Sequence, residues 1–235
     1  MYTTKFNGLS IFQGKDFTKD QLLEYALSFS NEKSNDLKDK ILHWDFGPIM
    51  EMKYDINAQN YLFSDELVPF HWDGAFHRVP RLLLFYCLET EGKGGETLFT
   101  NTELLWKSLT LEEQNLCLKI QLTYQTEKKA HYGGEICLPL VQKHPLTGNI
   151  ILRMAEEVRT KLNPVTMLAQ AEGENSDKVD TLIKKILSKL YSEEFLITHS
   201  WNAGDLILVD NYTFLHGRNK LGNNRSRKFY RIQIL

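Results

Sequence analysis

The order of short strand-like segments constrains the fold of this chain more than any other feature of its sequence. Residues 81–88 form a continuous apolar run, which is typical of a strand that is buried on both faces. Four further segments resemble strands and are bounded by Gly, Asn or Pro: 121–127, 149–154, 205–210 and 228–235. These strands do not alternate regularly with helices, so the pattern disfavours a parallel sheet built from strand–helix–strand units.

Helical periodicity places a few helices around these strands. Two longer helices and two short ones are expected, at residues 16–29, 101–108, 110–119 and 177–191. The helix at 110–119 opens on a capping box, with Thr110 at its N-cap and Glu113 three residues later. This order predicts a mainly β fold with inserted helices, whose core is a double-stranded β-helix, or jelly roll.

Length and composition narrow the class of protein. A chain of 235 residues without repeats or a Pro/Ser-rich linker suits a single domain, residues 1–235, with helical insertions. Its net charge of −2 gives no electrostatic reason to expect nucleic acid or an anionic membrane as partner. The N-terminal residues lack the apolar run of a secretory signal, and no apolar stretch is long enough to span a membrane. The oligomeric state has no signal in the sequence.

The three cysteines are odd in number and well separated, so they do not indicate a disulfide framework or a zinc cluster. We interpret Cys87, Cys117 and Cys137 as small buried hydrophobic residues of a protein in a reducing compartment. The expected location is therefore the cytoplasm.

His71 and Asp73 are the first two residues of a candidate metal site. In an extended segment, residues i and i+2 point to the same face, so both side chains can reach one metal ion while Trp72 turns away and Gly74 allows close approach. A third ligand is available at His216, and two imidazoles with one carboxylate form the facial triad of non-haem Fe(II) oxygenases. A bare His-X-Asp is weak evidence by itself, because a loop histidine bonded to its neighbouring carboxylate gives the same pattern.

Arginines of the C-terminal strand offer a candidate anion site. Arg227 and Arg231 have the same parity, so they lie on one face of the strand at 228–235. This face either meets water or points into the lumen of the barrel. In the lumen, a guanidinium would bind a dicarboxylate in a bidentate manner, and the bound anion would compensate the cost of burying the charge.

Four sequence blocks together resemble one enzyme family. They are PFHWDG at 69–74, GGETLF at 94–99, KHPLTG at 143–148, and GDLILVDN at 204–211 leading into LHGR at 215–218. In this order they are similar to the TauD/TfdA family of Fe(II)- and 2-oxoglutarate-dependent oxygenases, and they cover most of the chain from about residue 60 onward. The resemblance implies that His71, Asp73 and His216 bind Fe(II) at an open site for O2.

The resemblance also implies how 2-oxoglutarate is bound. Thr97 would hydrogen-bond the distal carboxylate of this cosubstrate, and Arg227, eleven residues after His216, would form a salt bridge with it. Arg231 would lie near the iron-bound carboxylate or the substrate. Arg218 is a weaker candidate, because we expect it in a turn that faces solvent.

The implied reaction converts 2-oxoglutarate to succinate and carbon dioxide and removes hydrogen from a small molecule. Asp73 disfavours halogenation, because halogenating relatives have a small residue in its place. Residues 68–76 resemble the oxygenases of isonitrile biosynthesis (the pyoverdine/paerucumarin branch), which act on isonitrile derivatives of tyrosine or tryptophan by desaturation or oxidative decarboxylation.

Three alternatives remain open at this point. A generic small-acid or amino-acid hydroxylase of the same family fits the same motifs. A zinc hydrolase could use the same three ligands with an activated water, but it would leave Thr97, Arg227 and Arg231 without a role. A non-catalytic binding module would not need the intact set of ligands.

The other histidines and aromatic residues near the motifs receive plainer interpretations. We expect His144 to stabilise a turn before a strand and His77 to line the substrate pocket. No motif partner stands near His43, His131 or His199, so each is expected to be a structurally satisfied or an exposed histidine. Packing roles are expected for Trp72, Phe76 and Tyr86, and Phe76 could also wall the pocket.

Overall fold

The computed structural model describes residues 3–31, 33–91, 93–129 and 132–235. The α-helices are α1 (Lys19–Leu27), α2 (Leu37–Lys40), α3 (Thr102–Lys107), α4 (Leu111–Cys117) and α5 (Ser176–Lys189), with a 3₁₀ helix at Tyr61–Phe63. The strands are β1 (Thr3–Phe6), β2 (Leu9–Phe12), β3 (Ile49–Lys53), β4 (Val68–His71), β5 (Leu82–Glu89), β6 (Thr97–Asn101), β7 (Ile120–Lys129), β8 (Tyr132–Pro139), β9 (Val141–Lys143), β10 (Ile150–Leu152), β11 (Val165–Ala171), β12 (Leu196–His199), β13 (Leu206–Asp210), β14 (Phe214–Arg218) and β15 (Lys228–Ile234).

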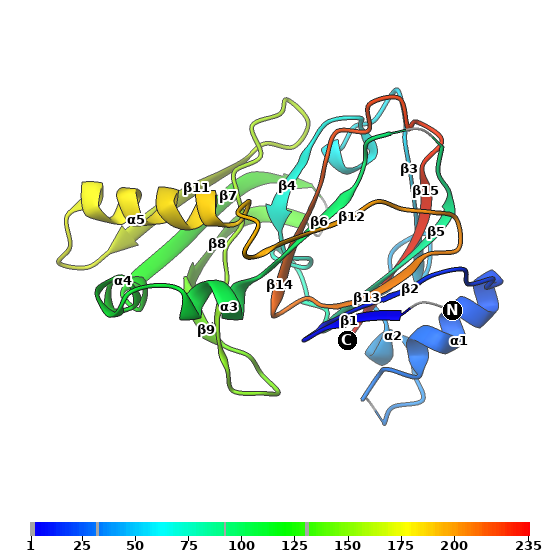
Figure 1. Ribbon diagram of the computed structural model, residues 1–235, viewed down its shortest axis with the longest axis horizontal. Helices are drawn as coiled ribbons and strands as arrows, with labels where there is room; N and C mark the ends of the chain where they lie inside the picture. The colour runs from blue at the N-terminus through cyan, green and yellow to red at the C-terminus, as the bar shows by residue number, and fades with distance from the viewer. Residues whose placement is uncertain (1–2, 32, 92, 130–131) are drawn as a thin grey trace.

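Two antiparallel sheets form the centre of the fold (Figure 1). The larger has the strand order β1-β2-β13-β5-β15-β3, and the smaller has the order β12-β6-β14-β4. Side chains from both sheets share one apolar cluster, in which Leu83 and Phe85 of β5 meet Phe99 of β6 and Phe214 of β14. This packing of one sheet on the other confirms the predicted mainly β fold with a jelly-roll core.

The strand expected at 81–88 is β5, and both of its faces are buried. Because successive side chains of a strand alternate, Leu84 points away from the inner cluster and packs in a second cluster with Ile232 of β15. Leu22 and Ala26 of α1 cover this outer face. The apolar run is therefore continuous because a sheet lies on one side of β5 and a helix lies on the other.

A second lobe packs beside the two sheets (Figure 1). It contains the three-stranded sheet β11-β7-β8 together with α4 and α5. The apolar stripe of α5 is buried against this lobe, as the periodicity predicts, through Val179, Leu182, Ile183 and Ile186. Burial of this apolar face against the three-stranded sheet therefore positions the helix.

The predicted helices are confirmed to within a few residues, including the capping box in which Thr110 accepts from the backbone of Glu113. Several short strands have no counterpart among the predictions, and β6 and β14 are the most important of them. Both are buried along their whole length yet carry polar residues such as Thr97 and His216. Such strands lack the alternation of apolar and polar residues that sequence analysis relies on.

The interpretation of the cysteines holds for two of the three. Cys87 and Cys117 are buried, whereas Cys137 is exposed, so the prediction of a buried residue at 137 is wrong. Cys137 lies on β8, the edge strand of the three-stranded sheet, where exposed and partly buried residues alternate. Its side chain falls on the exposed face of that strand.

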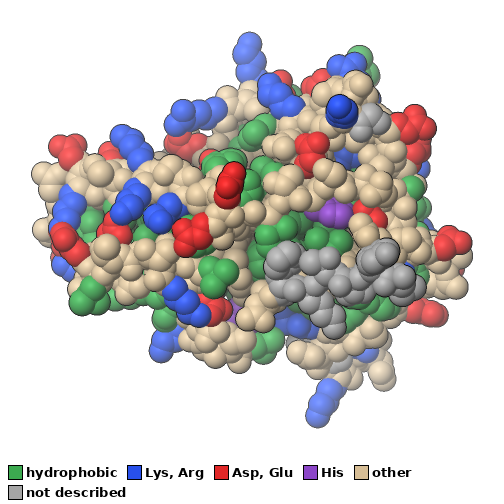
Figure 2. All heavy atoms as spheres, viewed as in Figure 1, with side chains coloured by type: hydrophobic (Ala, Val, Ile, Leu, Met, Phe, Trp, Pro, Cys, Tyr) green, Lys and Arg blue, Asp and Glu red, His purple; other side chains and the backbone are tan. Residues whose placement is uncertain are grey.

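Charged side chains of both signs are interspersed on the face of the molecule drawn in Figure 2. In the described part of the chain, none of the helices combines the length and the apolar composition needed to cross a membrane.

Candidate metal centre and cosubstrate site

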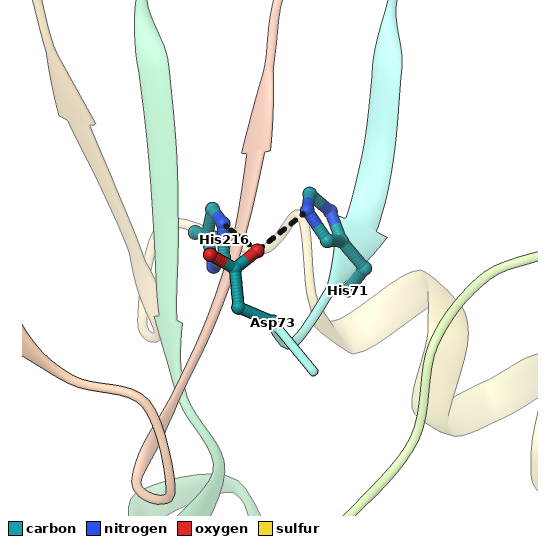
Figure 3. A group of neighbouring side chains, drawn as sticks. All are labelled: His71, Asp73 and His216. Atoms are coloured by element: carbon teal, nitrogen blue, oxygen red, sulfur yellow. Dashed lines mark ion pairs between the residues drawn. The ribbon is translucent and has the colours of Figure 1, made fainter. Parts of the chain in front are cut away.

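Two neighbouring strands bring the predicted metal ligands together (Figure 3). His71 ends β4, and it lies directly opposite His216 of the antiparallel strand β14. Their rings are 4.3 Å apart, and the Nε2 atoms lie 3.7 Å and 3.6 Å from Oδ1 of Asp73. One potential ligand atom from each of the three residues lies within 4.8 Å of the others. This spacing suits a single ion bound on one face.

Backbone contacts explain why these strands meet at this point. A Cβ atom at Gly217 would lie 2.8 Å from the carbonyl oxygen of Val68, so only glycine lets β14 approach β4 so closely beside His216. Asp73 stands in the turn that follows β4. The side chain of Asn211 holds this turn, because it accepts from the Asp73 N–H at 2.9 Å and donates to the Asp73 carbonyl at 3.1 Å.

Both imidazoles are suited to metal binding. Nδ1 of His71 lies 2.9 Å from the carbonyl oxygen of Pro69, so Nδ1 carries the proton and donates it, and the lone pair of Nε2 faces the centre. Burial, followed by the nearby imidazole of His71, lowers the pKa of His216 to about 3. At neutral pH, His216 is therefore an uncharged imidazole, which is the form that binds a metal.

The carboxyl group of Asp73 stays ionised although it is buried. Burial alone would raise the pKa of Asp73, but the guanidinium of Arg231 and then the two imidazoles hold it well below its ordinary range. Nη1 of Arg231 lies 3.3 Å from Oδ2, and Nε2 of Gln233 donates to the same oxygen at 2.6 Å. Arg231 thus contacts the triad itself. Gln233 was given no role by sequence analysis, although its parity on β15 matches that of Arg231.

Thr97, Arg227 and Trp201 form a second polar group. Thr97 lies on β6 two residues from Phe99, which is the residue directly opposite His216. Trp201 donates its indole N–H to the hydroxyl oxygen of Thr97 at 2.8 Å, and Nη2 of Arg227 donates to the same oxygen at 3.4 Å. A threonine hydroxyl has two acceptor lone pairs and one hydrogen to donate. Because both lone pairs are engaged, the O–H of Thr97 is left to donate to an acceptor such as a carboxylate. Trp201 had no place in the sequence interpretation, since its contact spans 104 residues.

Arg227 is a buried cation, and none of the described carboxylates forms an ion pair with it. Its Nε atom is buried and has no hydrogen-bond partner among the described residues, and its guanidinium lies 3.9 Å from the ring centre of Phe229. Burial, followed by the charge of Arg218, lowers the pKa of Arg227 to about 9. A buried cation of this kind is compensated when an anion binds to it.

A cavity of about 460 Å³ opens on two of the three candidate ligands, His71 and Asp73. Arg231 also lines it. Aromatic side chains make up much of the remaining wall, together with His77, as predicted: Trp44, Phe46, Tyr61, Phe63, Trp72 and Tyr132. Phe76 packs on Tyr132 at a ring distance of 5.4 Å and lies behind this wall.

One prediction about a polar residue is wrong. Arg218 does not face solvent: it is buried in β14 and donates to the carbonyl oxygens of Leu62, Ser64 and Glu66 at 2.7 to 2.8 Å. Its two terminal nitrogens hold the loop before β4, and its buried Nε has no hydrogen-bond partner among the described residues. His199 is a satisfied structural histidine, as expected, because its Nε2 lies 3.1 Å from Oδ2 of Asp205. The carbonyl partners of Arg218 lie more than 150 residues earlier in the chain, which is why the sequence did not indicate them.

Several structural interpretations are confirmed. His144 bonds Oδ2 of Asp210 at 2.8 Å and accepts from the backbone of the turn that follows it. His43 contacts the carbonyl of Ile41 at 3.0 Å. Trp72 packs in the apolar cluster of the second lobe, and the ring of Tyr86 packs between β5 and α1. His131 lies outside the described residues.

This fold and this arrangement of two imidazoles and a carboxylate define the class of protein. The sequence profile of the taurine catabolism dioxygenase TauD, TfdA family matches residues 6–233. The chain therefore belongs to the TauD/TfdA dioxygenase family.

Individual relatives refine the comparison. The chain is 38% identical over 202 residues to a 3-((Z)-2-isocyanoethenyl)-1H-indole synthase of Fischerella ambigua, and the match covers 83% of this chain and 73% of the relative. It is 27% identical over 235 residues to a tyrosine isonitrile desaturase of Erwinia amylovora, covering 96% of this chain and 76% of the relative. Among solved structures it is similar to PvcB of Pseudomonas aeruginosa, with a TM-score of 0.73 and 24% identity over 97% of this chain and 75% of that one. That likeness shows the shared fold.

Proposed function

We propose that this protein is a non-haem Fe(II)- and 2-oxoglutarate-dependent oxygenase that uses O2 to desaturate or oxidatively decarboxylate an isonitrile derivative of tryptophan or tyrosine. The observation that carries the proposal is the juxtaposition of two buried features. One is the group of His71, Asp73 and His216, of which His71 and Asp73 line a cavity. The other is the buried guanidinium of Arg227, which donates to Thr97, two residues along β6 from the strand partner of His216.

The donor set fits Fe(II). His71 through Nε2, Asp73 through Oδ1 and His216 through its imidazole would hold the ion, because these groups converge and carry the right protonation states. When bound together with 2-oxoglutarate and O2, the ion supplies the oxidant that removes hydrogen from the substrate, while 2-oxoglutarate is converted to succinate and carbon dioxide.

The donors around Arg227 fit a carboxylate. The free Nε–H of Arg227 and the free O–H of Thr97 would bind the distal carboxylate of 2-oxoglutarate, and Trp201 orients that hydroxyl. Arg231 forms an ion pair with Asp73 and keeps its carboxyl group ionised. These residues would thus hold the cosubstrate by its distal carboxylate in one orientation and leave its other end free to reach the triad.

The walls of the cavity support an aromatic substrate. Trp44, Tyr61 and Phe63 give flat apolar surfaces that bury a phenol or indole ring and exclude water from the triad. The named activities of the Fischerella and Erwinia relatives agree with such a ring. A generic small-acid hydroxylase would call for a more polar cavity, and a zinc hydrolase would leave Arg227 buried without an anion.

We also propose that residues 1–235 work as one domain in the cytoplasm, with a small molecule as the partner rather than nucleic acid or membrane. The thiols of Cys87 and Cys117 are buried and unpaired, and burial raises the pKa of each to about 12. Cys137 is a free exposed thiol, which suits a reducing compartment.

Anaerobic absorption spectroscopy followed by a turnover assay tests the function. Adding Fe(II) and 2-oxoglutarate to the protein should produce a weak visible charge-transfer band, and tryptophan isonitrile or tyrosine isonitrile should then increase succinate release in air. The Asp73→Ala variant should show neither signal. Full turnover by this variant, or the lack of a band with folded wild-type protein, would refute the proposal.

A further inference from the structure

Two hydrogen bonds connect the aromatic wall of the cavity to the carboxylate of the triad. The indole Nε1 of Trp44 lies 2.9 Å from Oε1 of Gln233. Nε2 of the same amide lies 2.6 Å from Oδ2 of Asp73. The path therefore runs from Trp44 through one side-chain amide to Asp73.

The chemistry of the two ends determines the orientation of the amide. An indole N–H can only donate, and an ionised carboxylate can only accept. Only one orientation of Gln233 satisfies both neighbours, with its oxygen toward Trp44 and its NH2 group toward Asp73. An amide in the opposite orientation would place its oxygen against the carboxylate, so the two bonds stabilise each other.

The fold holds both ends of this path in place. The segment before Trp44 pairs with β15, because the N–H of Leu42 donates to the carbonyl of Gln233 at 2.9 Å and Ile41 bridges to Ile234. Trp44 then begins a tight turn whose ends are joined by N–H···O bonds of 3.1 Å and 2.8 Å to Gly47. Gln233 itself is only 4% exposed, so its amide is largely shielded from bulk water.

The hydrogen bond to Asp73 acts on one oxygen of the carboxylate. Gln233 donates to Oδ2, whereas Oδ1 lies 3.7 Å and 3.6 Å from the Nε2 atoms of His71 and His216. Nη1 of Arg231 lies between the two oxygens, at 3.4 Å and 3.3 Å. Asp73 therefore presents Oδ1 to the centre while Oδ2 is engaged. A one-oxygen ligand leaves more of the metal face open than a two-oxygen ligand would.

Trp44 lines the cavity and would contact a ligand bound there. Its ring is stacked with that of Phe46, with a 17° interplanar angle and a centroid distance of 6.3 Å, and His77 contacts it at 6.1 Å. All three side chains line the cavity. A ring that packs on Trp44 restricts the movement of the indole and thereby of the Gln233 amide.

We propose that Gln233 and Trp44 are positioning residues that hold Asp73 as a one-oxygen ligand and couple occupation of the aromatic wall to the metal centre. This inference rests on the proposed function, because it takes the triad to be the metal site and the cavity to be the substrate site. Its distinctive consequence is that a wall residue without contact to the metal changes the properties of the bound ion.

Metal binding alone tests the first half of the proposal. Co(II) is titrated into the metal-free protein and its visible absorption gives both the dissociation constant and the coordination. Gln233→Met has nearly the shape of glutamine but neither hydrogen bond, so we expect about a tenfold to hundredfold loss of Co(II) affinity. Trp44→Phe keeps an aromatic ring and the amide, and a smaller loss with an altered Co(II) spectrum is expected. Trp106 lies on α3 and packs against the apolar cluster that also contains the buried face of α5, so Trp106→Phe is the control and should bind as the wild type does.

Substrate binding tests the second half. Tryptophan isonitrile is added anaerobically to the protein with Fe(II) and 2-oxoglutarate, and the shift of the charge-transfer band is recorded at saturation. The shift seen in wild type should be reduced or lost in Trp44→Phe and Gln233→Met. Phe46→Leu, a change in the same wall that keeps both hydrogen bonds, should raise the concentration needed for saturation but preserve the shift.

The outcomes separate the two levels of inference. The coupling is refuted if Trp44→Phe and Gln233→Met both retain the wild-type Co(II) affinity, spectrum and band shift. The proposed function fails instead if wild type forms no band, or if Asp73→Ala binds Co(II) as tightly as wild type does. Circular dichroism of each variant confirms folding, and Trp44→Phe keeps the test decisive if Gln233→Met does not fold.

Discussion

Replacing Arg227 by Met separates the contribution of this arginine to cosubstrate binding from its contribution to folding. The guanidinium is buried, has no carboxylate partner among the described residues, and lies against Thr97 and Phe229. A hydrogen bond to a charged group is worth about 1.5–3 kcal/mol. Loss of about 3 kcal/mol from a bidentate contact corresponds to a roughly hundredfold weaker dissociation constant for 2-oxoglutarate.

The same substitution should not destabilise the protein in the absence of 2-oxoglutarate. Without an anion, Arg227 is a desolvated cation, and burial lowers its pKa to about 9. Removing an uncompensated buried charge is neutral or stabilising when the new side chain fills the space. The melting temperature of the Arg227→Met variant should therefore equal or exceed that of wild type.

Thermal unfolding with and without 2-oxoglutarate measures both effects. At a concentration 100 times the wild-type dissociation constant, the ligand stabilises wild type by about 2.7 kcal/mol. A variant that binds a hundredfold more weakly gains only about 0.4 kcal/mol at the same concentration. Arg225→Met is the matched control, because Arg225 is exposed and pairs with Asp65 at the surface. An undiminished thermal shift in Arg227→Met would refute the placement of the carboxylate.

Three further substitutions have defined outcomes. Trp201→Phe removes the N–H that occupies one lone pair of Thr97, so the KM for 2-oxoglutarate should rise about tenfold while kcat changes less, as steady-state succinate assays can show. Burial lowers the pKa of His199, so the folded state holds fewer protons than the unfolded state as the pH falls below the ordinary value of 6.5. The free energy of unfolding should therefore decrease below that pH, and less steeply in His199→Gln, when urea unfolding is compared at pH 7 and pH 5. Gly217→Ala forces a Cβ against the carbonyl of Val68, so β14 must move from β4 and Co(II) affinity should fall; wild-type affinity would contradict the close approach.

Sequence patterns predicted the parts of the fold that depend on local order. The apolar stripe of α5 repeats along one segment, and the capping box of Thr110 spans only four residues. Both patterns are therefore visible without knowledge of the fold. The same holds for β5, where an apolar run records burial on both faces. The resemblance to a known family then brought His71, Asp73 and His216 into one site, and their side chains do converge in the structure.

The residues that sequence analysis left out share a different property. Trp44 reaches Gln233 across 189 positions, and Trp201 reaches Thr97 across 104. Each contact joins a loop tryptophan to a strand residue that it reaches only in the folded protein, and neither involves a repeated pattern. The error at Arg218 has the same origin, because its partners lie in a loop more than 150 residues earlier. A charged residue next to a turn is read as exposed unless the loop that covers it is known.

The position of β15 in the larger sheet has a consequence for how the enzyme matures in the cell. This strand carries Arg231 and Gln233 and lies between β5 and β3, both of which are synthesised much earlier. Because β3 pairs with β15 and with no other described strand of this sheet, β3 has no partner there until β15 has been synthesised. His71, Asp73 and His216 all precede β15 in the chain, but Arg231 and Gln233, which contact the Asp73 carboxylate, arrive with that strand. The contacts that hold Asp73 are therefore among the last to form during synthesis.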